Sequence, residues 1–331
     1  MSAIIPPRID RGQTIGIVAP AGPVRFIRLQ KGIERLGSAF RVELAPSLVT
    51  DAVVGPATTL NGPVIAGRKR EPTLPSYLSA TDEVRAQELR DMIANPDIRA
   101  IILARGGYGI TRILSLLDPD ALRRDPKPIV GFSDATALLA WAWAAGVRAI
   151  HGPVIAQLSD LGASHVEHLV RVLTDPAPLG IRPWSLTAHG QGVHEGPLVV
   201  ANLTLASLLV GTPWPLPLAG SIAIFEEVGE RPYEIDRYFT QLLLTGELAK
   251  IRAVLMGDLA RCDDTNPATN EKDPPDAAMI TTLERLRAAN LPIAAGAPIG
   301  HGARNEAVPF GAHAVLDLDH ATFEITDGAV A

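Results

Sequence analysis

A short apolar strand passes directly into a helix in the stretch Lys127-Pro128-Ile129-Val130-Gly131-Phe132-Ser133-Asp134-Ala135-Thr136-Ala137-Leu138-Leu139-Ala140-Trp141. The strand ends before Ser133 and the helix continues to Gly146, so this serine occupies a strand-to-helix turn. Hydrolases display nucleophilic serines on such turns, where the amide groups and partial positive charge of a helix N-terminus face the site. The pattern Gly-x-Ser-x-Gly is incomplete here, because Ala135 stands at its last position. An ordinary helix cap is the alternative role for the serine.

Outward from this turn, apolar strands alternate with helical segments up to about residue 160. Such alternation is typical of a parallel sheet with helices on its faces. We therefore predict an α/β protein whose N-terminal domain, residues 1–160, has a parallel sheet of the flavodoxin or amidotransferase type and carries Ser133. The strands are predicted at Ile15-Val18, Val42-Leu44, Ile101-Leu103 and Ile129-Val130.

The second half of the chain is richer in short strands, arranged around a helix predicted from Asp236 to Leu248. We predict a smaller, strand-rich C-terminal domain at residues 196–331, joined to the first domain by a polar linker at 161–195. The strands are predicted at Ile222-Phe225, Val254-Met256, Val315-Leu318 and Phe323-Ile325.

A glycine-rich loop, Gly106-Gly107-Tyr108-Gly109, follows the strand predicted at Arg99-Arg105 and precedes a helix predicted through Ile113 and Leu117. Its uncovered backbone N–H groups could bind an anion or a developing oxyanion. A dinucleotide-binding loop is the competing interpretation, but the loop does not match Gly-x-Gly-x-x-Gly and no Gly-Lys-Ser/Thr follows it. A tight structural turn is the remaining alternative.

A histidine and a carboxylate that would activate Ser133 occur in the second half of the chain. His301 is flanked by two glycines, which let the backbone place its imidazole freely. A catalytic imidazole needs a carboxylate to fix its tautomer and to stabilise its cation. Glu226 and Glu227 follow each other at the end of a predicted strand, where side chains alternate between faces. At most one of the two therefore faces the histidine.

Ordinary structural roles are the alternatives for these residues. Either glutamate could be a solvated carboxylate or the partner of Arg231 or Arg237. His151 is a rival base at another strand end, and we interpret it as a structural or supporting histidine. Because Ser133 belongs to the first predicted domain and the other two candidates to the second, the site is expected between the domains, a common place for a cleft.

The chain also contains residues of metal-ligand type near its end, namely His313, Asp317, Asp319 and His320. The segment that holds them alternates between apolar and polar residues, which is typical of a half-exposed strand. It shows no closely spaced ligand motif. We therefore predict no metal and no cofactor.

The composition favours a globular enzyme that does not bind nucleic acid. With 331 residues and 47% hydrophobic content, the chain can bury one large core or two ordinary ones. Its net charge of -6 gives no basic footprint for nucleic acid. Cys262 is the one cysteine, which excludes an intramolecular disulfide and suits a reducing compartment.

Two stretches bear on localisation. Residues 1–13 contain Pro6-Pro7, Arg8 and Asp10, and lack the apolar segment of a signal peptide. Residues 196–225 are uncharged and long enough to span a bilayer, but a proline-rich segment at 211–217 divides them. We therefore expect a cytoplasmic protein without a membrane span.

Five blocks of sequence, in order from about residue 14 to about residue 317, make the chain similar to a known family. The blocks are Thr14-Ile15-Gly16-Ile17-Val18-Ala19-Pro20, Ala104-Arg105-Gly106-Gly107-Tyr108-Gly109, Gly131-Phe132-Ser133-Asp134, Glu226-Glu227-Val228-Gly229-Glu230 with Tyr233 through Arg237, and Gly300-His301-Gly302 with Asn305 and Val308-Pro309-Phe310-Gly311. Through them the chain resembles the LD-carboxypeptidase family of serine peptidases, which also includes the microcin C self-immunity proteins. One block alone would be weak evidence, whereas five in order are specific.

The resemblance implies a role for each matching residue. Ser133 would be the nucleophile, His301 the general base and then the acid, and Glu226 the carboxylate that orients the histidine. The oxyanion hole would consist of the backbone N–H of Asp134 and of one glycine in the Gly106-Gly107 pair.

The resemblance also implies an activity. The chain would be a serine carboxypeptidase that hydrolyses an L,D-peptide bond through an acyl-enzyme, with murein tetrapeptide as its substrate in peptidoglycan recycling, and would form a homodimer. One alternative is a microcin C immunity-type hydrolase of peptidyl- or aminoacyl-nucleotides. Another is an inactive peptide-binding homologue or a two-domain receptor. The missing signal peptide argues against the receptor, and the complete Ser, Glu and His set argues against an inactive homologue.

Substrate recognition has further candidates. An exopeptidase must hold the terminal carboxylate of its substrate, which a guanidinium can grip with two parallel hydrogen bonds. Arg304 follows His301 by three positions and is the favoured candidate, and Arg105 is the other, with structural ion pairs as the alternative for both. An apparent insertion at 58–73 and the linker at 161–195 could line the cleft and set substrate choice.

Overall fold

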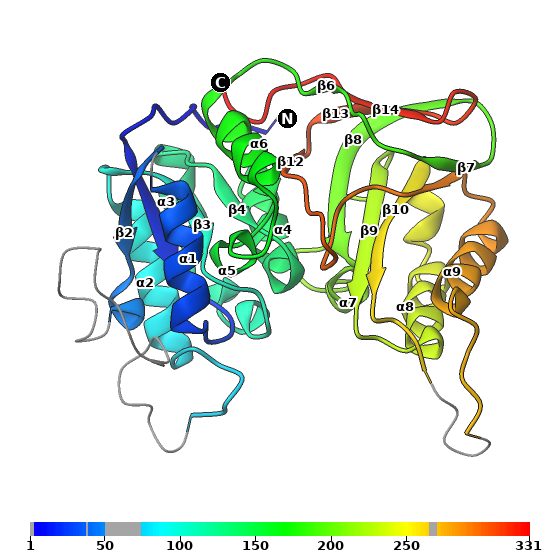
Figure 1. The fold of residues 1–331 in the computed structure, drawn as a ribbon, viewed down its shortest axis with the longest axis horizontal. Coiled ribbons are helices and arrows are strands. Elements are labelled where there is room, and N and C mark those ends of the chain that lie inside the picture. The colour runs from blue at the N-terminus through cyan, green and yellow to red at the C-terminus, as the bar shows by residue number, and fades with distance from the viewer. Residues whose placement is uncertain (1–2, 38, 50–73, 265–269) are drawn as a thin grey trace. The chain divides into compact units, whose positions relative to one another are not determined.

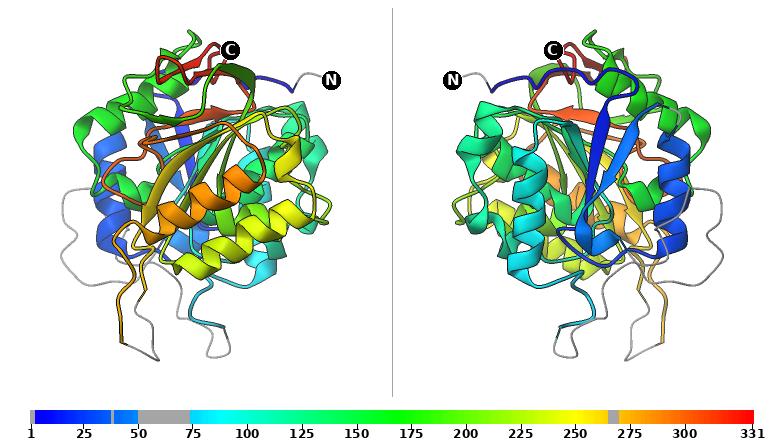
Figure 2. Two further views of the ribbon diagram at one scale, coloured as in Figure 1. Left: turned by 90° about the vertical axis from the view of Figure 1, so that its right-hand side faces the viewer. Right: turned by 90° about the vertical axis from the view of Figure 1, so that its left-hand side faces the viewer.

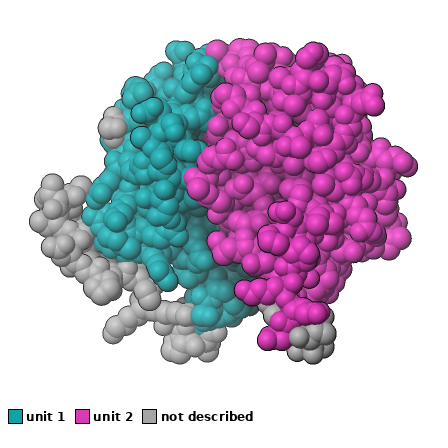
Figure 3. Space-filling model, turned by 45° about the vertical axis from the view of Figure 1, so that its right-hand side comes forward, with its two compact units in different colours: residues 1–176, 329–331 teal, residues 177–328 magenta. Residues whose placement is uncertain are grey.

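The computed structural model describes residues 3–37, 39–49, 74–264 and 270–331, so the apparent insertion at 58–73 lies outside the described residues. The chain divides into two compact units, coloured separately in Figure 3. Unit 1 consists of Met1–Pro176 and Ala329–Ala331, and unit 2 of Ala177–Gly328. The division lies inside the predicted linker, because the first part of the linker folds as a helix of unit 1. The last three residues also differ from the expectation, since they belong to unit 1.

Unit 1 is built around a parallel sheet (Figure 1). Its strands are β1 (Thr14–Val18), β2 (Arg41–Leu44), β3 (Ile98–Leu103), β4 (Ile129–Gly131) and β5 (Ala149–His151). They lie in the order β5-β4-β3-β1-β2, and each neighbouring pair is parallel. This is the strand order of the flavodoxin fold. The predicted α/β class and the predicted parallel sheet are confirmed.

Helices cover both faces of this sheet (Figure 2). On one face lie α1 (Phe26–Leu36), α5 (Ile155–Leu158) and α6 (Ala163–Thr174), and on the other lie α2 (Asp82–Ala94), α3 (Pro119–Arg124) and α4 (Thr136–Ala144). Strands covered on both faces must be apolar along their length, which explains the continuous apolar runs of the sequence. The helix α4 is itself buried from Thr136 to Ala142, in agreement with its apolar sequence.

The segment after the glycine loop does not form the predicted helix. It forms two short 3₁₀ turns, η2 (Ile110–Arg112) and η3 (Leu114–Leu116). Gly109 precedes them with a φ of 126°, and Pro119 follows them at the start of α3. The buried residues of this segment recur at a spacing of three, Ile110 with Ile113 and Leu114 with Leu117, which suits the three residues per turn of a 3₁₀ helix.

Unit 2 contains a mixed sheet, as expected for the strand-rich C-terminal domain. Its strands are β6 (Gly180–Ile181), β7 (Thr187–His189), β8 (Val193–Asn202), β9 (Ile222–Val228), β10 (Ala253–Ala260), β11 (Ile293–Ala295), β13 (His313–Asp317) and β14 (Thr322–Ile325). They lie in the order β6-β14-β13-β8-β9-β10-β11-β7. The short strand β12 (Val308–Phe310), which precedes β13 in the chain, is not part of this sheet. The central strands β8 to β11 run parallel, and the pairs toward both edges are antiparallel.

The helices of unit 2 are α7 (Leu203–Leu208), α8 (Pro232–Leu244) and α9 (Ala277–Ala288), and α8 packs against both others. The predicted helix at 236–248 begins earlier, because Pro232 stands at its first position and Glu234 accepts a hydrogen bond from the Arg231 N–H at 2.9 Å. Side chains from β8, β9, β10, β13 and β14 form a fully buried core, including Val200, Ile224, Leu255, Leu316 and Phe323. Within the described ranges, no helix is long and apolar enough to cross a membrane.

Candidate active site

Ser133 lies where β4 passes into α4, and its backbone is left-handed with a φ of 65°. A residue with a Cβ rarely adopts this conformation, which is unfavourable by about 1–2 kcal/mol. The 3₁₀ turn η4 (Ser133–Ala135) joins strand and helix, and the serine makes no capping hydrogen bond. A helix cap therefore does not explain this residue. Strain of this kind occurs where the surrounding structure fixes a functional side chain.

The incomplete Gly-x-Ser-x-Gly pattern has a steric explanation. A Cβ on Gly131 would lie 2.7 Å from the Cβ of Ala135, closer than real carbon atoms approach. The turn therefore accommodates a methyl group at position 135 only because position 131 carries none. The substitution of the last glycine by alanine is compatible with the sharp turn.

The glycine loop lies directly against the serine turn. A Cβ on Gly106 would lie 2.9 Å from the Cβ of Ser133 and 3.0 Å from its Oγ. Gly107 and Gly109 have φ values of 115° and 126°, which side chains rarely permit. The loop after β1 supports this loop from behind, because the Gly22 N–H donates to the Gly106 carbonyl at 3.2 Å. Backbone, and not side chain, therefore borders Ser133 on this side.

The side chain of Asp134 connects the glycine loop to the serine turn. Its Oδ2 accepts a hydrogen bond from the Ile110 N–H at 2.9 Å. Burial raises the pKa of Asp134 from 3.8 to about 6, although the N–H groups of Ile110 and Gly109 and the charge of Arg85 lower it. The fully buried Arg85 donates to the Gly109 carbonyl at 2.9 Å. Besides the backbone N–H expected from the sequence, Asp134 therefore contributes a buried carboxylate that links the two loops.

In unit 2, a buried carboxylate meets a histidine. Glu226 Oε2 on β9 lies 2.7 Å from His301 Nδ1. The glutamate side chain is fully buried, and the histidine side chain is 18% exposed. A carboxylate against Nδ1 fixes the ring orientation and favours the tautomer with its proton on Nδ1. The basic lone pair of the neutral ring is then on Nε2.

Glu227 has a different set of contacts, as the alternation of strand side chains predicts. Its carboxylate accepts hydrogen bonds at 2.8 Å from Asn202 Nδ2, from the N–H and the hydroxyl of Thr204, and from the Val228 N–H. These bonds join β9 to the N-terminus of α7. Burial raises the pKa of Glu227. Its position is that of a structural carboxylate.

The loop that carries His301 is held by two polar side chains. The Gly300 N–H donates to Asn305 Oδ1 at 3.2 Å, and the Gly302 N–H donates to Asp258 Oδ2 at 3.0 Å. Asn305 belongs to the blocks quoted from the sequence, whereas Asp258 is not among the sequence candidates. Its one sequence signal is its place just after an apolar strand.

His151 is buried at the end of β5, within unit 1. Its ring makes an edge-to-face contact with Phe132, with 5.9 Å between the centroids. Because Phe132 directly precedes Ser133, this contact supports the serine turn. The position agrees with the interpretation of His151 as a structural or supporting residue.

The two candidate arginines differ in their contacts. Arg105 Nη1 donates to the Pro23 carbonyl at 2.7 Å, which is a structural bond within unit 1. Arg304 is exposed. Its charge lowers the pKa of the neighbouring Asp258, while burial, the largest effect, raises that pKa.

The residues of metal-ligand type lie on β13 and in the turn after it. Burial alternates along β13, which confirms the predicted half-exposed strand. In the turn, His320 Nδ1 lies 2.8 Å from Asp317 Oδ2, an exposed ion pair that raises the pKa of the histidine.

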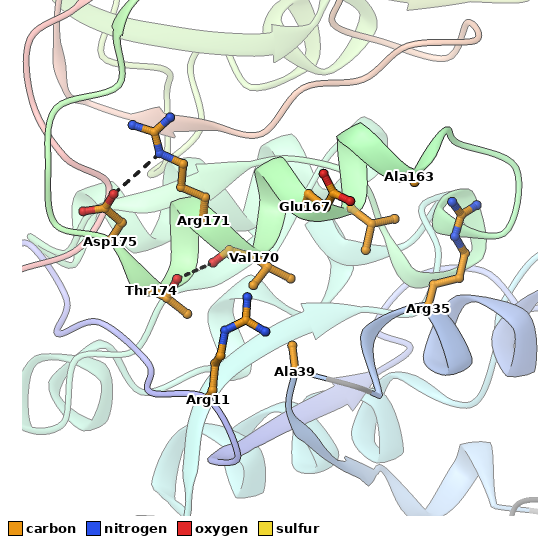
Figure 4. A pocket seen from close by; sticks show the side chains of 10 residues that line it. Arg11, Arg35, Ala39, Ala163, Glu167, Val170, Arg171, Thr174 and Asp175 are labelled. Atoms are coloured by element: carbon orange, nitrogen blue, oxygen red, sulfur yellow. Dashed lines mark hydrogen bonds and ion pairs between the residues drawn. The ribbon is translucent and has the colours of Figure 1, made fainter.

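A cavity of about 490 Å³ lies elsewhere in unit 1, between the end of α1 and α6 (Figure 4). Three arginines border it, but two of them have structural partners. Arg171 pairs with Asp175 at 3.5 Å, and Arg35 donates to the Leu158 carbonyl at 2.9 Å. None of the individual candidate residues lines this cavity, but seven of the ten residues that line it belong to the predicted linker 161–195.

Two family models match the chain. The model of the LD-carboxypeptidase N-terminal domain matches residues 15–152, and the model of the LD-carboxypeptidase C-terminal domain matches residues 195–316. A carboxypeptidase homologue of Streptomyces coelicolor is 34% identical over 97% of this chain and 95% of its own length. The murein tetrapeptide carboxypeptidase of Pseudomonas aeruginosa is 34% identical over 73% of this chain and 80% of its own length.

Solved structures share the fold of the whole chain. The muramoyltetrapeptide carboxypeptidase from Oxalobacter formigenes has a TM-score of 0.74 and 26% identity, and the match covers 96% of this chain and 99% of that one. MccF in complex with glutamyl sulfamoyl guanosine has a TM-score of 0.81 and 22% identity, and the match covers 99% of each chain. At that identity the second likeness concerns the fold alone.

Proposed function

Because the chain belongs to the LD-carboxypeptidase family, we propose that it is a serine carboxypeptidase that hydrolyses an L,D-peptide bond of murein tetrapeptide. One observation carries the proposal, namely the 2.7 Å contact between His301 Nδ1 and the buried carboxylate of Glu226. A histidine paired in this way can act as a general base through Nε2. Ser133 is the nucleophile that it would activate, because its strained turn serves no capping role.

In the acylation step, the Oγ of Ser133 attacks the scissile carbonyl carbon while its proton passes to Nε2 of His301. A new C–O bond forms, and the π electron pair of the carbonyl moves to its oxygen. The carboxylate of Glu226 stabilises the resulting imidazolium. The step requires that Nε2 come within hydrogen-bond reach of Oγ when substrate is bound.

The negative oxygen of this intermediate needs donors that are already in place. We assign them to the backbone N–H of Asp134 and of one glycine in the Gly106-Gly107 pair. Support comes from the close approach of Gly106 to Ser133 and from the carboxylate of Asp134, which holds the glycine loop against the turn.

The intermediate then collapses to an acyl-enzyme. The C–N bond breaks, and His301 gives its proton to the amine of the departing D-amino acid. In the second half of the reaction, His301 takes a proton from water, whose oxygen attacks the ester carbonyl. Collapse of this second intermediate releases the shortened peptide as an acid and returns the proton to Ser133. None of these steps requires a cofactor.

The terminal carboxylate of the substrate is assigned to Arg304. Support comes from its exposed guanidinium, three residues after His301. Arg304→Lys should raise KM for a peptide with a free carboxylate, because an ammonium cannot form two parallel hydrogen bonds. The same peptide capped as an amide serves as the control substrate, provided that it is cleaved. Equal losses on both substrates would move carboxylate recognition to another residue.

A second substrate class is suggested by one relative, the microcin C7 self-immunity protein MccF of Escherichia coli, which is 27% identical over 76% of this chain. An aminoacyl-nucleotide also carries an acyl bond that the same serine chemistry would cleave. The murein peptide remains our first choice, because the Pseudomonas aeruginosa murein tetrapeptide carboxypeptidase is 34% identical and the Escherichia coli MccF is 27% identical to this chain.

The deciding experiment is a substrate panel followed by mass spectrometry. It contains an L,D-tetrapeptide, its D,D-counterpart and an aminoacyl sulfamoyl adenosine. Release of the terminal D-amino acid from the first alone supports the proposal, and cleavage of the third alone would support the nucleotide hydrolase. No cleavage of any of them, together with no labelling of Ser133 by a serine-reactive phosphonate, would favour the inactive peptide-binding homologue.

Ser133→Ala should abolish nearly all turnover while it leaves the fold intact, because loss of the nucleophile in comparable triads lowers kcat by about a millionfold. The control is wild-type protein treated with a chelator, which should remain fully active. Activity that survives in Ser133→Ala but disappears with the chelator would overturn the proposed mechanism.

Localisation in the cytoplasm and a homodimeric state also stay predictions, and light scattering would measure the oligomeric state.

A further inference from the structure

Asp258, in β10, is one of the two residues whose side chains hold the histidine loop, and Asn305 is the other. We propose that Asp258 is a positioning residue that holds the loop 299–302 in the conformation in which His301 meets Glu226. The inference rests on the proposed function, since it gives His301 a supporting partner for its role as the base. All the contacts on which it rests lie within unit 2.

The backbone and side chain of Asp258 bracket His301 from both sides. The Asp258 N–H donates to the Ile299 carbonyl at 2.9 Å, before the histidine. Its Oδ2 accepts from the Gly302 N–H at 3.0 Å, after the histidine. One residue thus fixes the loop at two points that flank the imidazole. A loop fixed on one side alone would leave the ring free to turn away from Glu226.

Steric contacts explain why glycines flank His301. A Cβ on Gly302 would lie 2.2 Å from Asp258 Oδ2. A Cβ on Gly300 would lie 3.0 Å from the Cβ of Asp258 and 3.0 Å from Glu226 Oε2, and Gly300 also has a φ of 136°. The two glycines let the loop close onto these carboxylates. The glycines are needed because a side chain at either position would collide with Asp258 or Glu226, and not because the histidine must move freely.

The bulge in β10 gives Asp258 its position. The pairing of β10 with β9 shifts register between Met256 and Leu259, and Asp258 lies within this shift. A bulge at a strand end redirects side chains that regular pairing would place elsewhere. Gly257 permits the approach, because a Cβ there would lie 2.5 Å from the Ile299 carbonyl oxygen and 3.3 Å from the Cβ of Glu226.

The charge around Asp258 fits the same role. Burial raises its pKa, and the charge of Glu226 raises it further, whereas the Gly302 N–H, Arg304 and His301 lower it. A partly buried carboxylate beside the Glu226–His301 pair is electrostatically expensive to keep. The Asp258 carboxylate compensates for this cost in two ways. It accepts the hydrogen bond from the Gly302 N–H, and it adds negative charge near the imidazolium that forms during the reaction.

The test compares Asp258→Ala, Asp258→Asn and the control Asp276→Ala, which removes an exposed carboxylate of the same unit. Asp258→Ala should lower kcat for the L,D-tetrapeptide by about 10- to 100-fold with little change in KM, because a displacement of the base by about 1 Å can cost about 100-fold in rate. Asp258→Asn should recover most of this loss, because its amide oxygen can still accept from the Gly302 N–H. Asp276→Ala should have the wild-type kcat.

A second readout does not depend on activity. In a Ser133→Ala background, NMR of histidine-labelled protein should show a downfield Nδ1 proton for His301 against Glu226. Asp258→Ala should remove this resonance, and Asp258→Asn should retain it. An unchanged resonance and an unchanged kcat in Asp258→Ala would overturn the inference. Loss of the resonance in a protein that cleaves none of the substrates would support the positioning role and overturn the proposed function.

Gly302→Ala covers the case in which Asp258→Ala does not fold. Gly302 has no left-handed φ, so the added methyl group acts mainly through its contact with Asp258 Oδ2. It should displace the carboxylate, lower kcat and weaken the Nδ1 resonance. Wild-type values for both would overturn the inference.

Discussion

Ser133 combines a reactive position with an unfavourable backbone. Its φ of 65° suits glycine better than any residue with a Cβ. Glycine has no hydroxyl, so a nucleophile at this position requires a residue whose backbone is strained. The surrounding packing holds the residue in place, with Gly106 against one side and the Gly131–Ala135 contact beneath. At this scale, the candidate nucleophile is marked by conformation as well as by its place in the sequence.

This strain leads to a stability prediction. Ser133→Gly should be more stable than Ser133→Ala by roughly 0.5–1 kcal/mol, because relief of the left-handed strain exceeds the entropy that glycine loses. Ala135→Gly is the matched control, since Ala135 has a helical φ of -63° and glycine there should destabilise the protein. Urea denaturation measures all three free energies of unfolding. A Ser133→Gly variant less stable than Ser133→Ala would contradict the prediction.

The adjacent glutamates should separate activity from stability. Glu226→Gln should lower kcat by about ten-thousand-fold with little loss of stability, because an amide cannot stabilise the imidazolium. Glu227→Gln should keep most of kcat and lower the free energy of unfolding by about 1–3 kcal/mol, because an NH₂ group would face the donors of Asn202 or Thr204. Kinetics and denaturation on both variants check this. A reversed pattern would remove Glu226 from the proposed triad.

At the scale of elements, the candidate residues of unit 1 gather at the carboxyl ends of parallel strands. The loops after β1 and β3 and the turn after β4 meet there, and ligands of open α/β sheets bind at this edge. Side chains and hydrogen bonds between loops hold the arrangement together. Asp134 is the link between the last two of these segments.

Asp134 should make stability depend on pH. Its folded pKa of about 6 lies above the ordinary 3.8, so the folded state binds the proton more tightly than the unfolded state. Its contribution to the free energy of unfolding is therefore full below pH 3.8 and is lost as the pH rises through about 6. Asp134→Asn removes this dependence. The stability of the variant relative to wild type should rise by roughly 2 kcal/mol between pH 4 and pH 7.

Asp118 provides a control of opposite sign. The Asp120 N–H bonds its carboxylate at the start of α3 and lowers the pKa of Asp118, so its contribution is present at neutral pH and is lost in acid. Asp118→Asn should therefore lose stability relative to wild type as the pH rises through the acid range. If both variants showed the same slope, the assignment of the slope to Asp134 would fail.

At the scale of the whole molecule, the chain completes unit 1 with its last three residues. The Arg8 N–H donates to the Ala331 carbonyl at 2.9 Å, the Ala331 N–H donates to the Pro6 carbonyl at 2.9 Å, and Val330 is 2% exposed. The unit that carries Ser133 therefore needs residues from beyond unit 2 in the sequence. Its stability depends on this long-range connection.

Val330→Thr should reveal this connection. The two side chains have nearly the same shape, so the buried hydroxyl is the main change and should lower the free energy of unfolding by about 1–3 kcal/mol. Val193→Thr makes the same change at a residue that is 60% exposed, and its effect should stay within about 0.5 kcal/mol. Hydrogen exchange should show reduced protection of β1 and β3 in Val330→Thr. Equal effects of the two variants would argue against a structural role of the last residues.

Local patterns in the sequence were sufficient for much of the fold. The apolar runs at β1, β3 and β4 specify buried parallel strands, because helices on both faces leave no exposed side for polar residues. The alternation of strand side chains separates Glu226 from Glu227, since neighbours in a strand face opposite ways. Both signals arise from residues that are adjacent in the chain. The helix expected through Ile113 and Leu117 was wrong, because apolar residues that recur every three positions are also buried by the two 3₁₀ turns that form there.

The sequence by itself determined the α/β class, the strand ends and the residues displayed on them, because each depends on neighbours within a few positions. Only the tertiary structure decided that Asp134 bonds Ile110 and that Asp258 bonds Gly302, contacts that span 24 and 44 positions. It also decided where the units divide. Such contacts depend on strand order, register and a bulge, and these are set by packing across the whole sheet rather than by any short stretch of residues.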